Sequence, residues 1–208
     1  GARAAEWLEL DAMLRVAEQA PALEVDGDGP RSGPHGTRCR IGIADDQAFH
    51  FYYPDNLRRL ELAGADLVRF SPVGDRTLPD VDGLYLGGGY PELYAKRLSG
   101  NAAMRQAIVT FAEEGGPVYA ECGGLMYLTR GLWTVEGTRF EMVGLLPTET
   151  RMCDQLQALG YVEVELQRSS TLGAAGTRFR GHQFRYSKLD PFPGGRGGCG
   201  RAVRRRRP

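Results

Sequence analysis

The sequence predicts an α/β domain with a mostly parallel sheet, helices on both faces of that sheet, and a mixed or antiparallel C-terminal part. Between residues 40 and 131, short apolar runs alternate with stretches of helical length, and this alternation is typical of βαβ units. After Gly131, strand-like runs follow one another without long helices between them. That change of pattern predicts antiparallel or mixed pairing in the second half.

The elements of the first half are bounded by residues that interrupt regular structure. We expect a helix to end at Gly64, a strand to stop at Ser71-Pro72, and another helix to end at Gly115-Gly116. The expected strands are 41–44, 65–70, 83–86 and 117–120, and the expected helices are 53–63, 91–98, 102–114 and one that begins at Leu125. In the second half, the expected strands are 140–146, 161–166 and 179–186.

The predicted domain spans residues 40–192, and three further segments lie outside it. Residues 1–20 carry apolar side chains at helical spacing, so we expect a helix that belongs to something upstream. Residues 21–39 are rich in Gly, Pro and Asp and are interpreted as a linker. Residues 193–208 are interpreted as a disordered Gly/Arg-rich tail, and a tail that binds a partner is the alternative.

Composition argues against several classes of function. Lys plus Arg and Asp plus Glu both count 26, so the net charge of zero gives no support to a nucleic-acid or membrane surface. The four cysteines form no CxxC pair, which argues against a zinc site. No leader-like or long apolar stretch is visible, so we expect a cytoplasmic protein with reduced thiols and no metal of its own.

Cys122 has the sequence surroundings of a nucleophile. A predicted strand runs into Glu121-Cys122-Gly123-Gly124 and then into a helix, with the small Ala120 and Gly124 on either side. This is the pattern of a nucleophile elbow with Cys in place of Ser. The N–H groups and dipole of the following helix favour a thiolate, and the N–H of Gly123 would face a developing oxyanion. The alternative is a buried, inert cysteine at the end of the sheet.

A second Gly-rich strand end, Gly87-Gly88-Gly89, follows the predicted strand 83–86. Three glycines let the backbone approach a ligand closely, as in a phosphate cradle, but the spacing fits neither a P-loop nor a dinucleotide fingerprint. In an acyl-transfer site this loop would supply a second oxyanion N–H. Because both Gly-rich turns follow parallel strands, we expect them along the same edge of the sheet. The alternative is a tight turn without a functional role.

A cysteine nucleophile needs a base, and the chain contains three histidines. His35 lies in the predicted linker and is interpreted as exposed and without a role. His50 follows the first predicted strand. His182 is the one histidine downstream of Cys122 in a strand-like segment, which makes it the favoured base.

Several of these stretches resemble one known family. Residues 48–57, 82–92, 120–128 and 181–184 are similar to the C-terminal amidotransferase domain of the cobyrinate (hydrogenobyrinate) a,c-diamide synthases, in the cobyric acid synthase-like group of class I glutamine amidotransferases. The resemblance extends over about residues 40–190. It implies a class I glutamine amidotransferase-like (flavodoxin-like) fold. It also implies that residues 1–20 are the terminal helix of a missing ATP-binding domain.

The resemblance further implies a reaction and its partners. Cys122 attacks the side-chain amide of glutamine with His182 as the base, and Gly87, Gly88, Gly89 and Gly123 bind the oxyanion and glutamine. The ammonia released passes to an ATP-binding synthetase domain. There ATP and Mg2+ activate the a and c carboxylates of cobyrinate or hydrogenobyrinate, a step of cobalamin biosynthesis. This chain alone is expected to hold no cofactor.

One position departs from the family pattern. The family's usual motif has a second histidine where this chain has Arg185, and an arginine stays protonated and cannot act as a base. His182 and Arg185 are three residues apart, so on a regular strand they point to opposite faces. Three interpretations stay open: a bulge that brings His182 to Cys122, a thiolate supported by the helix dipole and a nearby cation, or impaired glutaminase activity.

The alternative functions are therefore a catalytically impaired amidotransferase-fold module or an amidotransferase acting on another corrinoid carboxylate. A more distant alternative is an α/β hydrolase-like cysteine protein.

Overall fold

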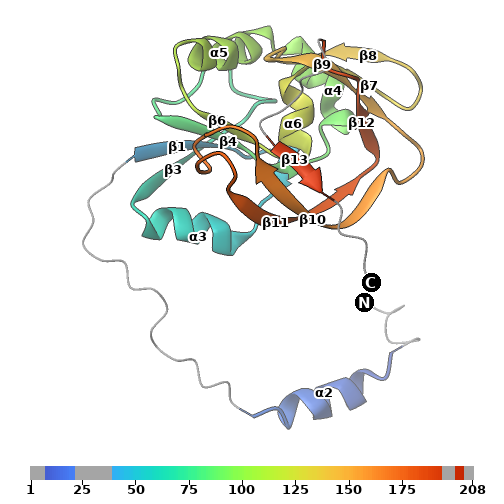
Figure 1. Ribbon diagram of the computed structural model, residues 1–208. Coiled ribbons are helices and arrows are strands. Elements are labelled where there is room, and N and C mark those ends of the chain that lie inside the picture. Colours follow the sequence, from blue (N-terminus) through green and yellow to red (C-terminus); the bar gives the residue numbers. More distant parts are fainter. Residues whose placement is uncertain (1–7, 22–38, 194–199, 204–208) are drawn as a thin grey trace. The chain divides into compact units, whose positions relative to one another are not determined.

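The structure is a computed structural model that describes residues 8–21, 39–193 and 200–203 (Figure 1). The chain divides into two compact units, residues 1–32 and 33–208. In the first unit, helix α2 (Leu10–Glu18) confirms part of the helix expected over residues 1–20. None of the α2 residues is buried. Residues 1–7 of the expected helix and residues 22–38 of the expected linker lie outside the described residues.

The second unit is built on a four-stranded sheet in the order β3-β1-β4-β6. All three neighbouring pairs are parallel, as the alternating pattern predicts. The strands are β1 (Cys39–Ala44), β3 (Ala65–Phe70), β4 (Gly83–Leu86) and β6 (Val118–Ala120). In Figure 1, α3 (Pro54–Leu62) and α5 (Ala102–Glu113) lie on opposite sides of this sheet, which confirms the predicted fold class.

Helix boundaries follow from local chemistry. α3 begins at Pro54, which suits the first helical turn because proline has no N–H to lose, and ends before Gly64, whose φ is 97°. The side chain of Asn101 caps α5 by accepting a hydrogen bond from the N–H of Met104. The expected 91–98 helix is a 3-10 turn, η1 (Pro91–Tyr94), followed by α4 (Ala95–Gly100). α6 (Gly123–Leu128) begins two residues earlier than expected.

The second half contains strands that the sequence does not predict. The single strand expected over 140–146 is wrong. β8 (Arg139–Glu141) ends near the start of that range, and β9 (Leu146–Met152) begins only at its last residue. β7 (Thr129–Trp133) begins directly after α6, where continued helix was expected. Together with β12 (Ser187–Leu189), these strands form a mixed sheet in the order β12-β9-β7-β8, in which β7 and β9 are parallel.

Two further sheets belong to the described part of this unit. β10 (Ala158–Leu166) and β11 (Arg178–Arg185) pair antiparallel, close to the expected strands 161–166 and 179–186. β13 (Gly200–Val203) lies in the segment expected to be a disordered tail, and it pairs with β10. Residues 194–199 and 204–208 of that segment lie outside the described residues. The short strands β2 (Phe49–Phe51) and β5 (Gly88–Gly89) pair antiparallel and were not predicted.

The hydrophobic core packs α4, α5 and α6 against the sheets. Its fully buried members include Phe49, Leu86, Leu98, Ile108 and Leu132. Thr129 is the first residue of β7 and is also fully buried, and its hydroxyl donates a hydrogen bond to the carbonyl of Met126, 2.7 Å away. The core therefore fixes α6, the helix that follows Cys122.

Candidate active site

Cys122 occupies a backbone conformation that non-glycine residues rarely adopt. Its φ is 51° and its ψ is −116°, and no other non-glycine residue in the described part of the chain has a positive φ. β6 ends at Ala120 and α6 begins at Gly123, so Cys122 lies at a sharp strand-to-helix turn. Its side chain is exposed. Strained residues of this kind cluster at active sites, and this is the geometry predicted for a nucleophile elbow.

The glycines after Cys122 allow the turn to lie close against the end of β4. A Cβ atom on Gly124 would lie 2.2 Å from the carbonyl oxygen of Leu86, so only glycine fits there. The N–H of Gly124 donates to the carbonyl oxygens of Gly87 at 2.8 Å and Glu121 at 2.9 Å. The elbow is therefore hydrogen-bonded directly to the Gly87–Gly89 loop.

The same loop lies beside Cys122, as expected for two Gly-rich turns on neighbouring parallel strands. A Cβ atom on Gly88 would lie 3.5 Å from the Cβ of Cys122. A Cβ atom on Gly123 would lie 3.1 Å from the amide nitrogen of Gly89. The amide nitrogens that follow Cys122 and those of the loop thus come together at one edge of the sheet, where open α/β sheets bind ligands.

Gly87 makes a different contact from its two neighbours. Its N–H donates a hydrogen bond to the hydroxyl oxygen of Tyr52, 2.9 Å away. The Tyr52 hydroxyl in turn donates to the carbonyl oxygen of Ala44 at the end of β1. The N–H of Gly87 is therefore already bonded within the protein, and Gly87 fixes the loop.

Glu121, the residue before the nucleophile, is held by two tyrosines. Its carboxylate accepts hydrogen bonds from the hydroxyls of Tyr85 at 2.5 Å and Tyr119 at 3.2 Å. The rings of Tyr85 and Tyr119 are 5.1 Å apart in an edge-on arrangement. Burial, together with the neighbouring Glu121, raises the pKa of Tyr85 well above its usual range and that of Tyr119 to about 12. Both phenols stay protonated at neutral pH and act as donors to the carboxylate.

His182 lies on a regular part of β11. The pairing of β10 with β11 runs without a register shift from Ala158 opposite Arg185 to Glu165 opposite Arg178. No bulge in that ladder turns His182, so His182 and Arg185 point to opposite faces of their sheet. The side chain of Arg185 donates to the carbonyl oxygen of Ser187 at 2.7 Å.

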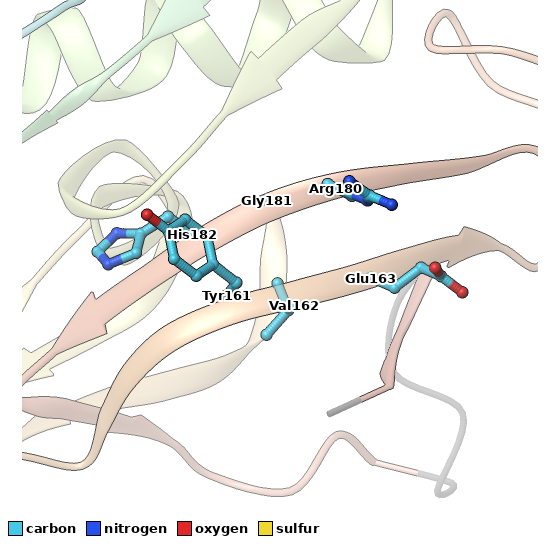
Figure 2. A pocket seen from close by; sticks show the side chains of 6 residues that line it. All are labelled: Tyr161, Val162, Glu163, Arg180, Gly181 and His182. Carbon is cyan, nitrogen blue, oxygen red and sulfur yellow. The ribbon is translucent and has the colours of Figure 1, made fainter. Parts of the chain in front are cut away.

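The surroundings of His182 are those of a separate pocket. Figure 2 shows His182 beside Tyr161 at one end of this pocket, with Arg180 and Glu163 at the other. The ring centroids of His182 and Tyr161 are 5.5 Å apart. The cavity measures about 660 Å³, and among the described residues neither Cys122 nor the Gly87–Gly89 loop lines it. The structure therefore shows no contact of His182 with Cys122, and their pairing stays a prediction.

Sequence reasoning gave no role to His50, which the structure places next to the Gly-rich loop. His50 is an exposed residue of β2, and Phe51 of the same strand pairs with Gly88. The His50 ring contacts those of Phe51 and Tyr90, at centroid distances of 4.7 and 5.9 Å. The aromatic run directly after the first strand was the one available signal for this arrangement.

The described part of the chain contains no group of three or more His, Cys, Asp or Glu side chains placed to hold a metal ion. Within the same residues, no helix has both the length and the apolar character needed to span a membrane.

Comparison with known families adds to this geometry. The sequence model of the CobB/CobQ-like glutamine amidotransferase domain matches residues 40–195. A cobyrinate a,c-diamide synthase of Leptospira interrogans is 51% identical over 185 residues, which is 88% of this chain and 40% of the relative. The same-named protein of Methanosarcina acetivorans is 44% identical over 201 residues, 89% of this chain and 40% of the relative. The chain thus spans about 40% of the length of these curated relatives.

Solved structures support the fold. PurLQS from Thermotoga maritima superposes with a TM-score of 0.58 at 15% identity, covering 80% of this chain and 75% of that one. A crystal structure of a glutamine amidotransferase gives a TM-score of 0.54 at 17% identity, covering 77% of this chain and 79% of that one. At these identities, the similarity shows the fold alone.

Proposed function

The chain belongs to the family of CobB/CobQ-like glutamine amidotransferase domains, and on that premise we propose that it hydrolyses glutamine at Cys122 to supply ammonia for corrinoid amidation. The observation that carries this proposal is the strained backbone of Cys122 between two Gly-rich turns. That arrangement presents an exposed thiol beside two sets of backbone amides. It suits attack on a carbonyl carbon whose oxygen becomes negatively charged.

The proposed reaction has two halves. The thiolate of Cys122 attacks the side-chain carbonyl carbon of glutamine and forms a tetrahedral intermediate, whose oxyanion accepts hydrogen bonds from the N–H of Gly123 and from Gly88 or Gly89. The carbon–nitrogen bond then breaks, the leaving nitrogen takes a proton from the base, and ammonia departs. Water attacks the remaining thioester, which releases glutamate and regenerates the thiol. Gly87 holds the loop in place through Tyr52.

We propose His182 as the base, and the structure adds His50 as its competitor. His182 is supported by being the one histidine that follows Cys122 in the sequence. As the base, it would require β11 to approach Cys122 more closely than the described contacts show. His50 has the support of its strand, which pairs with the Gly-rich loop. Arg185 can support a thiolate as a cation but cannot accept a proton.

The acceptor of the ammonia is proposed from the relatives. Those that match at 44–51% identity are named cobyrinate a,c-diamide synthases, which supports amidation of the a and c carboxylates of cobyrinate or hydrogenobyrinate in cobalamin biosynthesis. We propose that an ATP-binding synthetase part, which uses ATP and Mg2+ to activate those carboxylates, receives the ammonia. α2 would be the last helix of that part.

Cys39, Cys122 and Cys153 are free thiols, which supports a reducing, cytoplasmic compartment.

The test is glutamate release from glutamine by the purified chain, alone and with the synthetase part of a relative added. We expect Cys122→Ser to abolish release and the variant of the true base to lower it about 100-fold or more. The variants His182→Ala and His50→Ala compare the two bases directly. No release by the parent chain with the synthetase part, ATP and corrinoid present would contradict the proposal.

A catalytically impaired module is the second candidate, and Arg185 is the observation that favours it. If the missing histidine limits catalysis, Arg185→His should raise the rate of glutamate release from a low parent value. A rate that Arg185→His leaves unchanged in an active parent chain would exclude this candidate.

A further inference from the structure

Tyr52 bridges the carboxyl ends of two neighbouring parallel strands. Its hydroxyl donates to the carbonyl oxygen of Ala44, the last residue of β1, and accepts the N–H of Gly87, the residue after β4. The chain runs from β1 to β3 on one side and then crosses to β4 on the other. The crevice between β1 and β4 is thus the switch point of the sheet, where such folds place ligands. Here a side chain of the protein lies in it.

Both backbone polar groups of Gly87 are hydrogen-bonded. Its N–H is bonded to Tyr52 at 2.9 Å, and its carbonyl oxygen accepts the N–H of Gly124 at 2.8 Å. The next two residues of the loop are the ones that lie beside Cys122 and Gly123. Any displacement of Gly87 therefore moves the loop amides relative to the thiol.

The Tyr52 ring itself limits where the loop can go. A Cβ atom on Gly87 would lie 2.5 Å from a ring carbon of Tyr52, so the ring and the loop backbone are in close contact. The ring also packs edge-on against Tyr85 at a centroid distance of 5.1 Å. Burial raises the pKa of Tyr52 to about 12, so its hydroxyl remains protonated at neutral pH and can donate to Ala44 while it accepts from Gly87.

We propose that Tyr52 is the positioning residue of the oxyanion loop, and that its hydroxyl sets the place of the loop amides relative to Cys122. The proposal deepens the proposed glutaminase function and rests on it for its catalytic consequence. Its structural consequence, the anchoring of Gly87, does not depend on turnover. Tyr52 touches the loop and not the reacting atoms, so it acts through Gly88 and Gly89.

The test compares Tyr52→Phe with Tyr53→Phe. Phenylalanine at 52 keeps the ring and removes one oxygen atom, while the neighbouring Tyr53 is 71% exposed and serves as the matched control. The first measurement is hydrogen exchange of the Gly87 amide by NMR, with the amides of α5 as the reference for overall folding. We expect Gly87 to exchange at least about tenfold faster in Tyr52→Phe, because its acceptor is gone, and α5 to exchange as in the parent chain.

The second measurement separates positioning from general damage. Loss of a direct oxyanion donor costs about 100- to 1,000-fold in kcat, so a displaced loop should lower kcat about 10- to 100-fold. The KM for glutamine should change little. The rate at which the Cys122 thiolate displaces iodide from iodoacetamide should be unchanged, because that reaction forms no oxyanion. Tyr53→Phe should match the parent chain throughout.

The outcomes distinguish the two proposals. Parent-like exchange of Gly87 in Tyr52→Phe overturns the anchoring, whatever the activity. Faster exchange with an unchanged kcat overturns the positioning role in catalysis. Equal losses in kcat and in alkylation rate would show general damage to the site and would also count against the positioning role of Tyr52. An inactive parent chain contradicts the glutaminase function, while faster exchange at Gly87 in the variant still supports the anchor.

Discussion

Cys122 combines a reactive side chain with a backbone conformation suited to glycine. A residue held at φ 51° and ψ −116° costs about 1–3 kcal/mol relative to an unstrained one. The surrounding contacts hold it there, chiefly the two hydrogen bonds donated by the N–H of Gly124. Strain at this position exposes the sulfur beside the loop amides. The backbone conformation of Cys122 thus lowers the stability of the folded chain and exposes the thiol.

This strain predicts that Cys122→Gly is more stable than Cys122→Ala. Alanine keeps the strain, whereas glycine relieves it. The larger entropy of glycine in the unfolded state offsets about 0.5–1 kcal/mol of this gain. We therefore expect Cys122→Gly to be the more stable variant by roughly 1 kcal/mol. The free energy of unfolding in urea measures the difference. Both variants lack the thiol, so the difference between their free energies of unfolding does not arise from loss of the sulfur atom. Equal stabilities would mean that Cys122 carries no strain.

At the scale of the element, one carboxylate joins three strands of the mixed sheet. Glu149 of β9 accepts hydrogen bonds from the indole N–H of Trp133 on β7 and from the guanidinium of Arg139 on β8. The pair with Arg139 has a nitrogen–oxygen distance of 2.7 Å. The side chain of Glu149 is 23% exposed, so these contacts are only partly screened by solvent. The bond with Arg139, followed by that with Trp133, lowers the pKa of Glu149.

A lowered pKa makes this contribution dependent on pH. The folded state prefers the ionised carboxylate, so the stability it supplies is present above the ordinary glutamate pKa of about 4.3 and is lost as the pH falls through the lower folded value. We expect Glu149→Gln to lose about 1 kcal/mol at pH 7. The gap to the parent chain should shrink progressively below about pH 4.5. Urea unfolding at several pH values measures it.

The exposed Glu61 of α3 provides the matched control for this prediction, since Glu61→Gln removes the same charge from a helical side chain on the surface. Its stability should stay within about 0.5 kcal/mol of the parent at pH 7. A Glu149→Gln deficit that stays constant down to pH 3 would contradict a pKa-linked contribution.

Elements with a local signal were predictable, and those formed by distant pairing were not. β3 and β4 have the expected bounds because each is an apolar run with breakers on both sides. β2 has three residues and β5 has two glycines, so neither has a periodicity to detect, and each exists because the other pairs with it. β7 follows an apolar helix without a stop signal, and its place is set by pairing with β9.

The same distinction applies to the site. The elbow at Cys122 and the neighbouring Gly-rich loop were predictable because strand, turn and helix are contiguous in the sequence. The contact of Tyr52 with Gly87 joins residues that are 35 positions apart and requires knowledge of the strand order. The adjacency of His50 to the loop depends on the β2–β5 pairing, which has no local signal.

At the scale of the whole molecule, the chain consists of a folded amidotransferase unit and a helix with no buried residue. α2 exposes Leu10, Met13, Leu14 and Val16 to solvent. An apolar helical face normally buries itself against another element. The relatives are about two and a half times as long as the matched region, by the 40% of their length that is covered. We therefore expect the partner of that face in the synthetase part.

This predicts that deletion of residues 1–32 leaves the amidotransferase unit intact. Because residues 1–32 form a compact unit of their own, the free energy of unfolding of the remaining chain should stay within about 0.5 kcal/mol of the parent. Glutamate release by the chain alone should be unchanged, while any stimulation by the added synthetase part should weaken. Leu98→Ala is the contrasting variant, since removing a fully buried leucine costs about 2–5 kcal/mol. If the deletion destabilises the unit by an amount close to that of Leu98→Ala, α2 belongs to the core of this unit, and its assignment to the synthetase part is wrong.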